Sequence, residues 1–90
     1  MDTSGFEKQL QAEGFDKIET KSVAARTHND VHSHPFDVKA MVVQGQITLT
    51  VEGKSSTYRQ GDVFTMASGC GHIEDVGAEG VSYCVGRRNG

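Results

Sequence analysis

The most constraining feature of the sequence is residues 46–52, where polar and apolar side chains alternate without interruption. Alternate residues of an extended chain point to opposite faces, so Ile47, Leu49 and Val51 share one face. This pattern predicts a strand with one face in the core and the other toward solvent. A turn containing glycine follows, and residues 55–59 are predicted to return as the second arm of a hairpin.

Further short strands are predicted along the rest of the chain, separated by turns rich in glycine. They cover residues 18–27 (with 22–26 the stronger part), 32–42, 63–67, 72–76 and 81–85. Gly45 is predicted to turn the chain, residues 77–80 are predicted to form another turn, and residues 86–90 a loose tail. About eight short strands at regular spacing predict an all-β fold, an antiparallel β-barrel or jelly roll.

The N-terminal segment has the pattern of one short helix, at about residues 5–13. Ser4 with Glu7 has the form of a capping box, in which a cap hydroxyl and a glutamate three residues on bond each other's backbone amides. Phe6 and Leu10 are four residues apart and would share a helical face. We expect that face to lie on the barrel or on a second subunit, and the alternative is a frayed terminus.

At 90 residues the chain predicts a single domain, with a helical segment over residues 1–15, a barrel over 16–86 and a tail over 87–90. A domain this short buries only about 60% of the surface that its unfolded chain exposes. A bound metal or a partner subunit would therefore help to stabilise it.

The charge and the apolar runs exclude several classes of partner. The net charge of −3 argues against nucleic-acid binding, and Arg87 with Arg88, the only basic cluster, is expected to be a solvated tail. No apolar run approaches the ~20 residues that span a bilayer. The N-terminus lacks the basic start and apolar core of a signal peptide. We expect a cytoplasmic protein.

The two cysteines show no short-spacing motif, so a disulfide framework is not expected. Cys84 is predicted to pack as a small buried apolar residue. Cys70 stands two residues before His72 and could be a soft metal ligand, although the turn leaves its direction open.

Three histidines form the candidate metal site. His32 and His34 are two residues apart on a predicted strand, so their rings share a face. A stable site usually needs at least three protein ligands, and His72, after a glycine-rich turn, is the obvious third. His-x-His in an exposed loop can also be two solvated imidazoles. His28 would lie about 13 Å from His32 along a straight strand and is treated as a surface residue.

Over roughly residues 26–88, the chain resembles a small single-domain member of the cupin superfamily. The first cupin motif reads G-x5-H-x-H-x3,4-E-x6-G, and the second reads G-x5-P-x-G-x2-H-x3-N. The residues that match them are His32, His34, Gly45, Gly61, Gly69 and His72. Four positions depart from the motifs, namely Arg26, Val38, Ala67 and Val76.

The resemblance implies a metal site inside the barrel mouth and a homodimer. Val38 stands where the family has its metal-binding glutamate, so it implies a site of three histidines holding a divalent transition metal: iron, zinc, nickel or manganese. Three imidazoles leave coordination positions open for water or substrate, as in catalytic sites. A short chain with sheet edges to cover also favours dimerisation.

Other polar residues could take part in chemistry. Glu74 is two residues past His72 and could be a distant fourth ligand, a general base or a residue that orients a histidine, or strand twist could carry it to solvent. Tyr83 and, less so, Tyr58 could line the cavity or be core tyrosines. Asp37 and Lys39 have the opposite parity from the histidines and are expected to point outward.

Three functions stay open at this stage. One is a metal-dependent enzyme, an oxygenase or isomerase that acts on a small organic acid or diketone. Another is a sensor or binding module for a small molecule, without catalysis. The third is a structural barrel that keeps the histidines without a metal. Only the enzyme predicts an acid or base group in the pocket.

Overall fold

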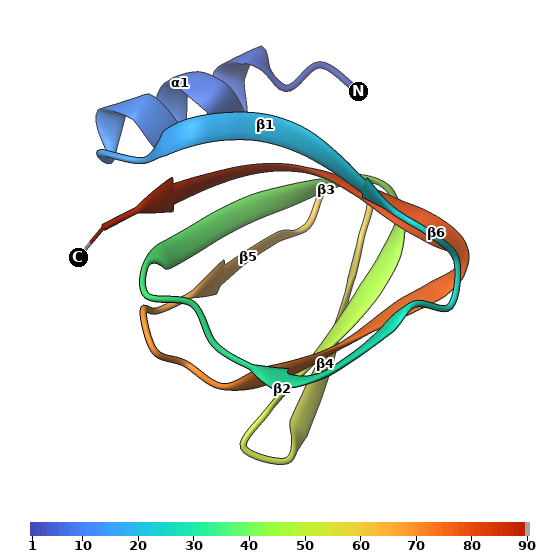
Figure 1. Ribbon diagram of the computed structural model, residues 1–90. Helices are drawn as coiled ribbons and strands as arrows, with labels where there is room; N and C mark the ends of the chain where they lie inside the picture. Colours follow the sequence, from blue (N-terminus) through green and yellow to red (C-terminus); the bar gives the residue numbers. More distant parts are fainter. Residues whose placement is uncertain (90) are drawn as a thin grey trace.

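The computed structural model describes residues 1–89 and confirms an antiparallel all-β barrel with one short N-terminal helix. The elements are α1 (Ser4–Ala12), β1 (Asp16–Val23), β2 (His28–His32), β3 (Asp37–Val51), β4 (Lys54–Arg59), β5 (Val63–Met66) and β6 (His72–Arg88). Figure 1 shows the strands curling around a common interior, with α1 lying outside them alongside β1. Among the described residues, no helix is long and apolar enough to cross a membrane.

The barrel is built on two long strands, β3 and β6, which pair with each other. The first part of β3 also pairs with β5 and its second part with β4. The first part of β6 pairs with β2 and its second part with β1. Each long strand thus serves both halves of the barrel, which is why six strands are observed where about eight short ones were predicted.

Both long strands pass through a bend where Gly45 meets Gly80. The φ angle of Gly45 is +76°, and a Cβ on this residue would lie 2.0 Å from the carbonyl oxygen of Gly80. The register of β3 with β6 shifts on either side of Gly45. The predicted reversals at Gly45 and at residues 77–80 are therefore wrong, because both segments continue their strands through a bend.

The first strand is also placed differently from the prediction. β1 begins at Asp16 and ends at Val23, so the strand signal assigned mainly to residues 22–26 was wrong. Residues 25–26 lie in a turn, in which Arg26 has a φ of 59°. The predicted strand over 32–42 is divided too, since β2 ends at His32 and β3 starts at Asp37.

Two apolar clusters lie on opposite sides of the curved sheet. The interior cluster consists of Val38, Ala40, Val42, Ile47, Leu49, Phe64, Met66, Val76 and Val81. The outer cluster lies under α1 and contains Phe6, Leu10, Phe15 and Cys84. The helix therefore packs on its own barrel, as one of the two expectations held, and Cys84 is buried as predicted.

The start of α1 differs from the predicted one. Thr3 occupies the cap position, makes no side-chain cap bond, and donates its hydroxyl to Glu7 at 2.6 Å. The predicted capping box with Ser4 does not form, because Ser4 is already within the helix.

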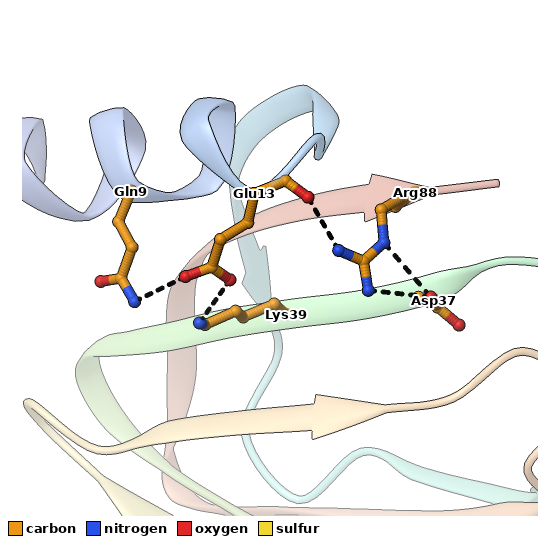
Figure 2. Close-up of polar contacts among 5 residues, drawn as sticks. All are labelled: Gln9, Glu13, Asp37, Lys39 and Arg88. Carbon is orange, nitrogen blue, oxygen red and sulfur yellow. Dashed lines mark hydrogen bonds and ion pairs between the residues drawn. The ribbon is translucent and has the colours of Figure 1, made fainter. Parts of the chain in front are cut away.

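The end of β6 is tied to the helix and to β3, as Figure 2 shows. Arg88 donates to the Glu13 carbonyl oxygen at 2.7 Å and pairs with Asp37 at 3.2 Å. Glu13 in turn pairs with Lys39 at 2.8 Å. Asp37 and Lys39 thus face outward as predicted. The predicted tail is wrong from Gly86 to Arg88, since β6 runs through these residues. The last residue of the predicted tail, Gly90, lies outside the described residues.

Candidate metal centre

The register of β2 on β6 brings the three histidines together. His32 ends β2 and is the direct partner of His72, the first residue of β6. His34 follows β2 by two residues and completes the group. One ring nitrogen from each histidine lies within 4.8 Å of one from each of the others. Two ligands that each lie about 2.1 Å from one ion are at most about 4.2 Å apart, so the group is close to a ligand arrangement.

Backbone carbonyls hold two of the rings by the same nitrogen. His72 Nδ1 lies 3.0 Å from the Cys70 carbonyl oxygen, and His32 Nδ1 lies 2.9 Å from the Asp30 carbonyl oxygen. A carbonyl oxygen can only accept, so each Nδ1 carries the proton and donates it. In the neutral rings, both Nε2 atoms then offer a lone pair. Tethering of the other ring nitrogen is typical of metal-binding histidines.

The environments of the rings differ in depth. His72 is only 1% exposed, whereas His32 and His34 are partly exposed. His34 stacks on Phe36 with ring centroids 5.1 Å apart. Burial, followed by the neighbouring His32 and His72, lowers the pKa of His34 below its ordinary value of 6.5. A neutral ring is the form that binds a metal, so these surroundings favour ligation.

Glu74 lies against the histidines and not in solvent, so the solvent alternative was wrong. Its Oε2 is 3.2 Å from His72 Nε2 and 3.7 Å from His32 Nε2. Its side chain is 18% exposed. Asn29, its partner across β2 and β6, donates Nδ2–H to Glu74 Oε1 at 3.1 Å. The carboxylate is thereby oriented with one oxygen toward the imidazoles.

A cavity of about 170 Å³ adjoins the group, with His34 and Glu74 in its wall. Its apolar lining comes from Phe36, Val38, Ile47, Phe64, Met66 and Val85. Its polar lining comes from Lys17, Glu19, Lys21, Tyr83 and Arg87. Burial, followed by the charges of Glu74 and Glu19, raises the pKa of Tyr83 above its ordinary value of 10.0. The phenol is therefore a proton donor at neutral pH.

The other candidate residues do not belong to the histidine group. Tyr58 packs against Phe64 with ring centroids 5.3 Å apart and belongs to the core, while Tyr83 lines the cavity. In the part of the chain that the structure describes, Cys70 is not in the histidine group, and its thiol faces the Gly71 carbonyl oxygen. His28 is exposed and bonded to Asp75, as expected of a surface residue.

Reasoning from the sequence missed the charged residues that β1 contributes to the cavity and the role of Asn29. Glu19 and Lys21 are two residues apart on β1, which places both on the side of the cavity, and Lys17 reaches it from the irregular start of the strand, where its φ is 51°. This spacing could have predicted charged residues in the cavity, but charged residues at alternate positions of a strand usually indicate the face toward solvent. The contact between Asn29 and Glu74 depends on strand register and has no local signature.

A family model described as the EutQ-like cupin domain matches residues 32–82, more than half of the chain. The chain belongs to the EutQ-like cupin family. The matched segment includes all three histidines and Glu74, and the resemblance inferred from the two motifs is confirmed. No curated protein matches this cupin in sequence.

Solved structures share the fold of this cupin at low sequence identity. A protein of unknown function from Rhizobium leguminosarum has a TM-score of 0.76 and 16% identity, over 81% of this chain and 69% of that one. DMSP lyase DddQ from Ruegeria pomeroyi has a TM-score of 0.70 and 19% identity, over 79% of this chain and 36% of that one. EutQ from Clostridium difficile has a TM-score of 0.62 and 10% identity, over 80% of this chain and 62% of that one.

Proposed function

We propose that this cupin is a metal-dependent enzyme that acts on a small organic acid, with His32, His34 and His72 as the metal ligands. The observation that carries the proposal is the convergence of three imidazoles beside a cavity whose wall includes one of them, His34. Two of the rings are fixed by backbone carbonyls so that their Nε2 atoms are available. A structural barrel without a metal would have no need of that arrangement.

The lining of the cavity supports a small anionic ligand. Lys17, Lys21 and Arg87 supply three positive charges, against two negative charges from Glu19 and Glu74. A divalent ion would add to the positive balance. The apolar lining suits a short carbon skeleton, and about 170 Å³ is well below the roughly 300–1,000 Å³ of pockets for drug-sized ligands. A carboxylate of a few carbons fits both the charge and the volume.

Tyr83 supports catalysis over simple binding. Its phenol lines the cavity and carries a proton at neutral pH, so it can donate that proton to an oxygen or carbon of a bound substrate. A divalent metal in such a site supplies Lewis-acid stabilisation of a developing oxyanion. These features favour a proton-transfer reaction, such as an isomerisation, over oxygenation. DddQ, a lyase by name, provides an example of an enzyme with this fold.

A ligand screen tests the proposal. Metal-loaded protein would be titrated calorimetrically with carboxylates of two to six carbons and with the corresponding neutral amides. We expect binding of at least one acid and weaker binding of its amide. Lys21→Gln should weaken acid binding, whereas Lys54→Gln, at the exposed start of β4, should not. Turnover that falls in Tyr83→Phe with ligand binding retained supports catalysis. Binding without turnover would make the protein a sensor module instead.

We also propose that the chain forms a homodimer. The strand order β1-β6-β3-β4 places β1 and β4 at the ends of the main path of the sheet, where strands can pair with another chain. Light scattering during size-exclusion chromatography should give about twice the chain mass of 9.7 kDa. A mass of one chain at micromolar concentration would contradict this proposal and leave the metal site untouched.

A further inference from the structure

The position of Val38 leaves the metal centre without the carboxylate that the first cupin motif provides. Val38 is 8% exposed, belongs to the interior cluster and pairs with Met66 across β3 and β5. Its side chain forms part of the apolar lining of the cavity. A carboxylate at the site, if there is one, has to come from another strand.

Glu74 on β6 places a carboxylate beside two of the three histidines. Its Oε2 lies 3.2 Å from Nε2 of His72 and 3.7 Å from Nε2 of His32. Ligands on one ion have separations of about 3 to 4 Å when each bond is about 2.1 Å long. The distances from Oε2 to both nitrogens fall in that range, while Glu74 lies outside the 4.8 Å group that the three histidines form.

The tethered rings leave their Nε2 atoms to meet the carboxylate, and a cation can lie between them. Because each Nδ1 is occupied by donation to a carbonyl, the neutral rings turn the lone pairs of their Nε2 atoms toward Oε2. In that form, an anionic oxygen 3.2 Å from the Nε2 lone pair of His72 needs a cation between the two atoms, whereas a ring protonated at Nε2 would donate to Oε2 directly. A metal ion would satisfy the two nitrogens and the oxygen together.

Asn29 supports the assignment by fixing the carboxylate. Its amide donates to Oε1 of Glu74, which leaves Oε2 free to face the rings. Asn29 and Glu74 are partners in the same pair of strands as His32 and His72. A hydrogen bond from a neighbour to the non-ligating oxygen is the usual arrangement around a ligating carboxylate.

We infer that Glu74 is a fourth metal ligand, supplied by β6 in place of the carboxylate that the first motif lacks at Val38. This inference rests on the proposed metal site and extends it from three nitrogens to three nitrogens and one oxygen. The added oxygen is a hard ligand, so it raises the relative affinity for manganese and iron over zinc. The carboxylate lowers the net charge of the ion together with its ligands by one.

The test is metal titration of metal-free wild type, Glu74→Gln and the matched control Glu19→Gln, which changes a carboxylate of the same cavity. Calorimetry would use Zn²⁺ and Mn²⁺ separately. X-ray absorption of the Mn²⁺ form would count nitrogen and oxygen neighbours. For Glu74→Gln we expect Mn²⁺ affinity to fall by more than about 100-fold, Zn²⁺ affinity by less, and one protein oxygen to be lost from the metal shell. Glu19→Gln should bind both ions as wild type does.

Equal affinities and spectra for Glu74→Gln and wild type would overturn the assignment while leaving the three-histidine site standing. Equal metal binding with lost turnover would also overturn it, by making Glu74 a general base. A wild-type protein that binds neither ion at neutral pH would refute the proposed function itself. The two failures are therefore distinguishable in one experiment.

Discussion

His32 and His72 face each other across β2 and β6, with ring centroids 4.3 Å apart, and each ring is held by the carbonyl two residues before it. The two segments thus present Nε2 in the same way, although 40 residues separate them in the chain. The centre is therefore assembled by strand register and by two short backbone tethers.

Removing the buried ring should abolish metal binding. His72→Gln takes away one of three nitrogen ligands, and two imidazoles alone make a weak site. We expect the metal content per chain to fall at least about tenfold after dialysis, measured by mass spectrometry of the element. His28→Gln is the control, because His28 is exposed and bonded to Asp75. Equal losses in both variants would count against the assigned ligands.

Metal affinity should depend on pH in the acid range. Protons compete for the imidazoles, so affinity should fall as the pH drops through roughly 6.5, the ordinary value for histidine. His34 has a pKa below that value, so its proton competes only at lower pH. Titrations at pH 7.5, 6.5 and 5.5 would measure the trend, and release of protons on binding would accompany it. Undiminished metal retention at pH 4 would argue against histidine ligation.

The bend at Gly45 provides a test of the fold. Gly45→Ala should lower the free energy of unfolding by roughly 3 kcal/mol, from a positive φ (about 1–2) and a backbone clash (about 1–3). Gly53 has a similar φ of +79° with nothing within 4 Å of a Cβ. Gly53→Ala should therefore cost about 1 kcal/mol. Urea unfolding of the two variants measures the difference, and equal costs would show that the contact with Gly80 is unimportant.

The ion pair between Asp37 and Arg88 should stabilise the fold at neutral pH, and this contribution should be lost when acid protonates Asp37. The amide of Ser68, followed by Arg88, lowers the pKa of Asp37 below its ordinary value of 3.8. For a carboxyl with a lowered pKa, the contribution is present above pH 3.8 and is lost as the pH falls through the folded value.

Asp37→Asn should therefore melt below wild type at pH 7, and the difference should narrow at pH 3. Thermal melts at the two pH values give the comparison, with Asp16→Asn, exposed at the start of β1, as the control. A gap that stays constant with pH would mean that the charge of Asp37 does not matter.

The sequence was informative wherever a local period determined the structure. Alternation predicted the hairpin of β3 and β4. The spacing of His32 and His34 predicted that the two rings lie together, although His34 follows the end of β2 and is not in a strand. The glycines of residues 77–80 led to a wrong prediction, because glycine occurs both where a chain reverses and where a strand bends against another backbone. The close contact between Gly80 and Gly45 identifies the bend, and it is visible only in the structure. The position of Glu74 could not be settled from its parity alone, since its neighbours Asn29 and His32 belong to another strand.

The most direct test of the metal centre is elemental analysis of the protein purified without a histidine tag and without chelators. We expect about one divalent transition metal per chain in wild type and in His28→Gln, and a near-absence of metal in His72→Gln. A wild-type protein that contains no metal, and that takes up none from added Zn²⁺, Mn²⁺, Fe²⁺ or Ni²⁺ at pH 7.5, would contradict the assigned metal centre.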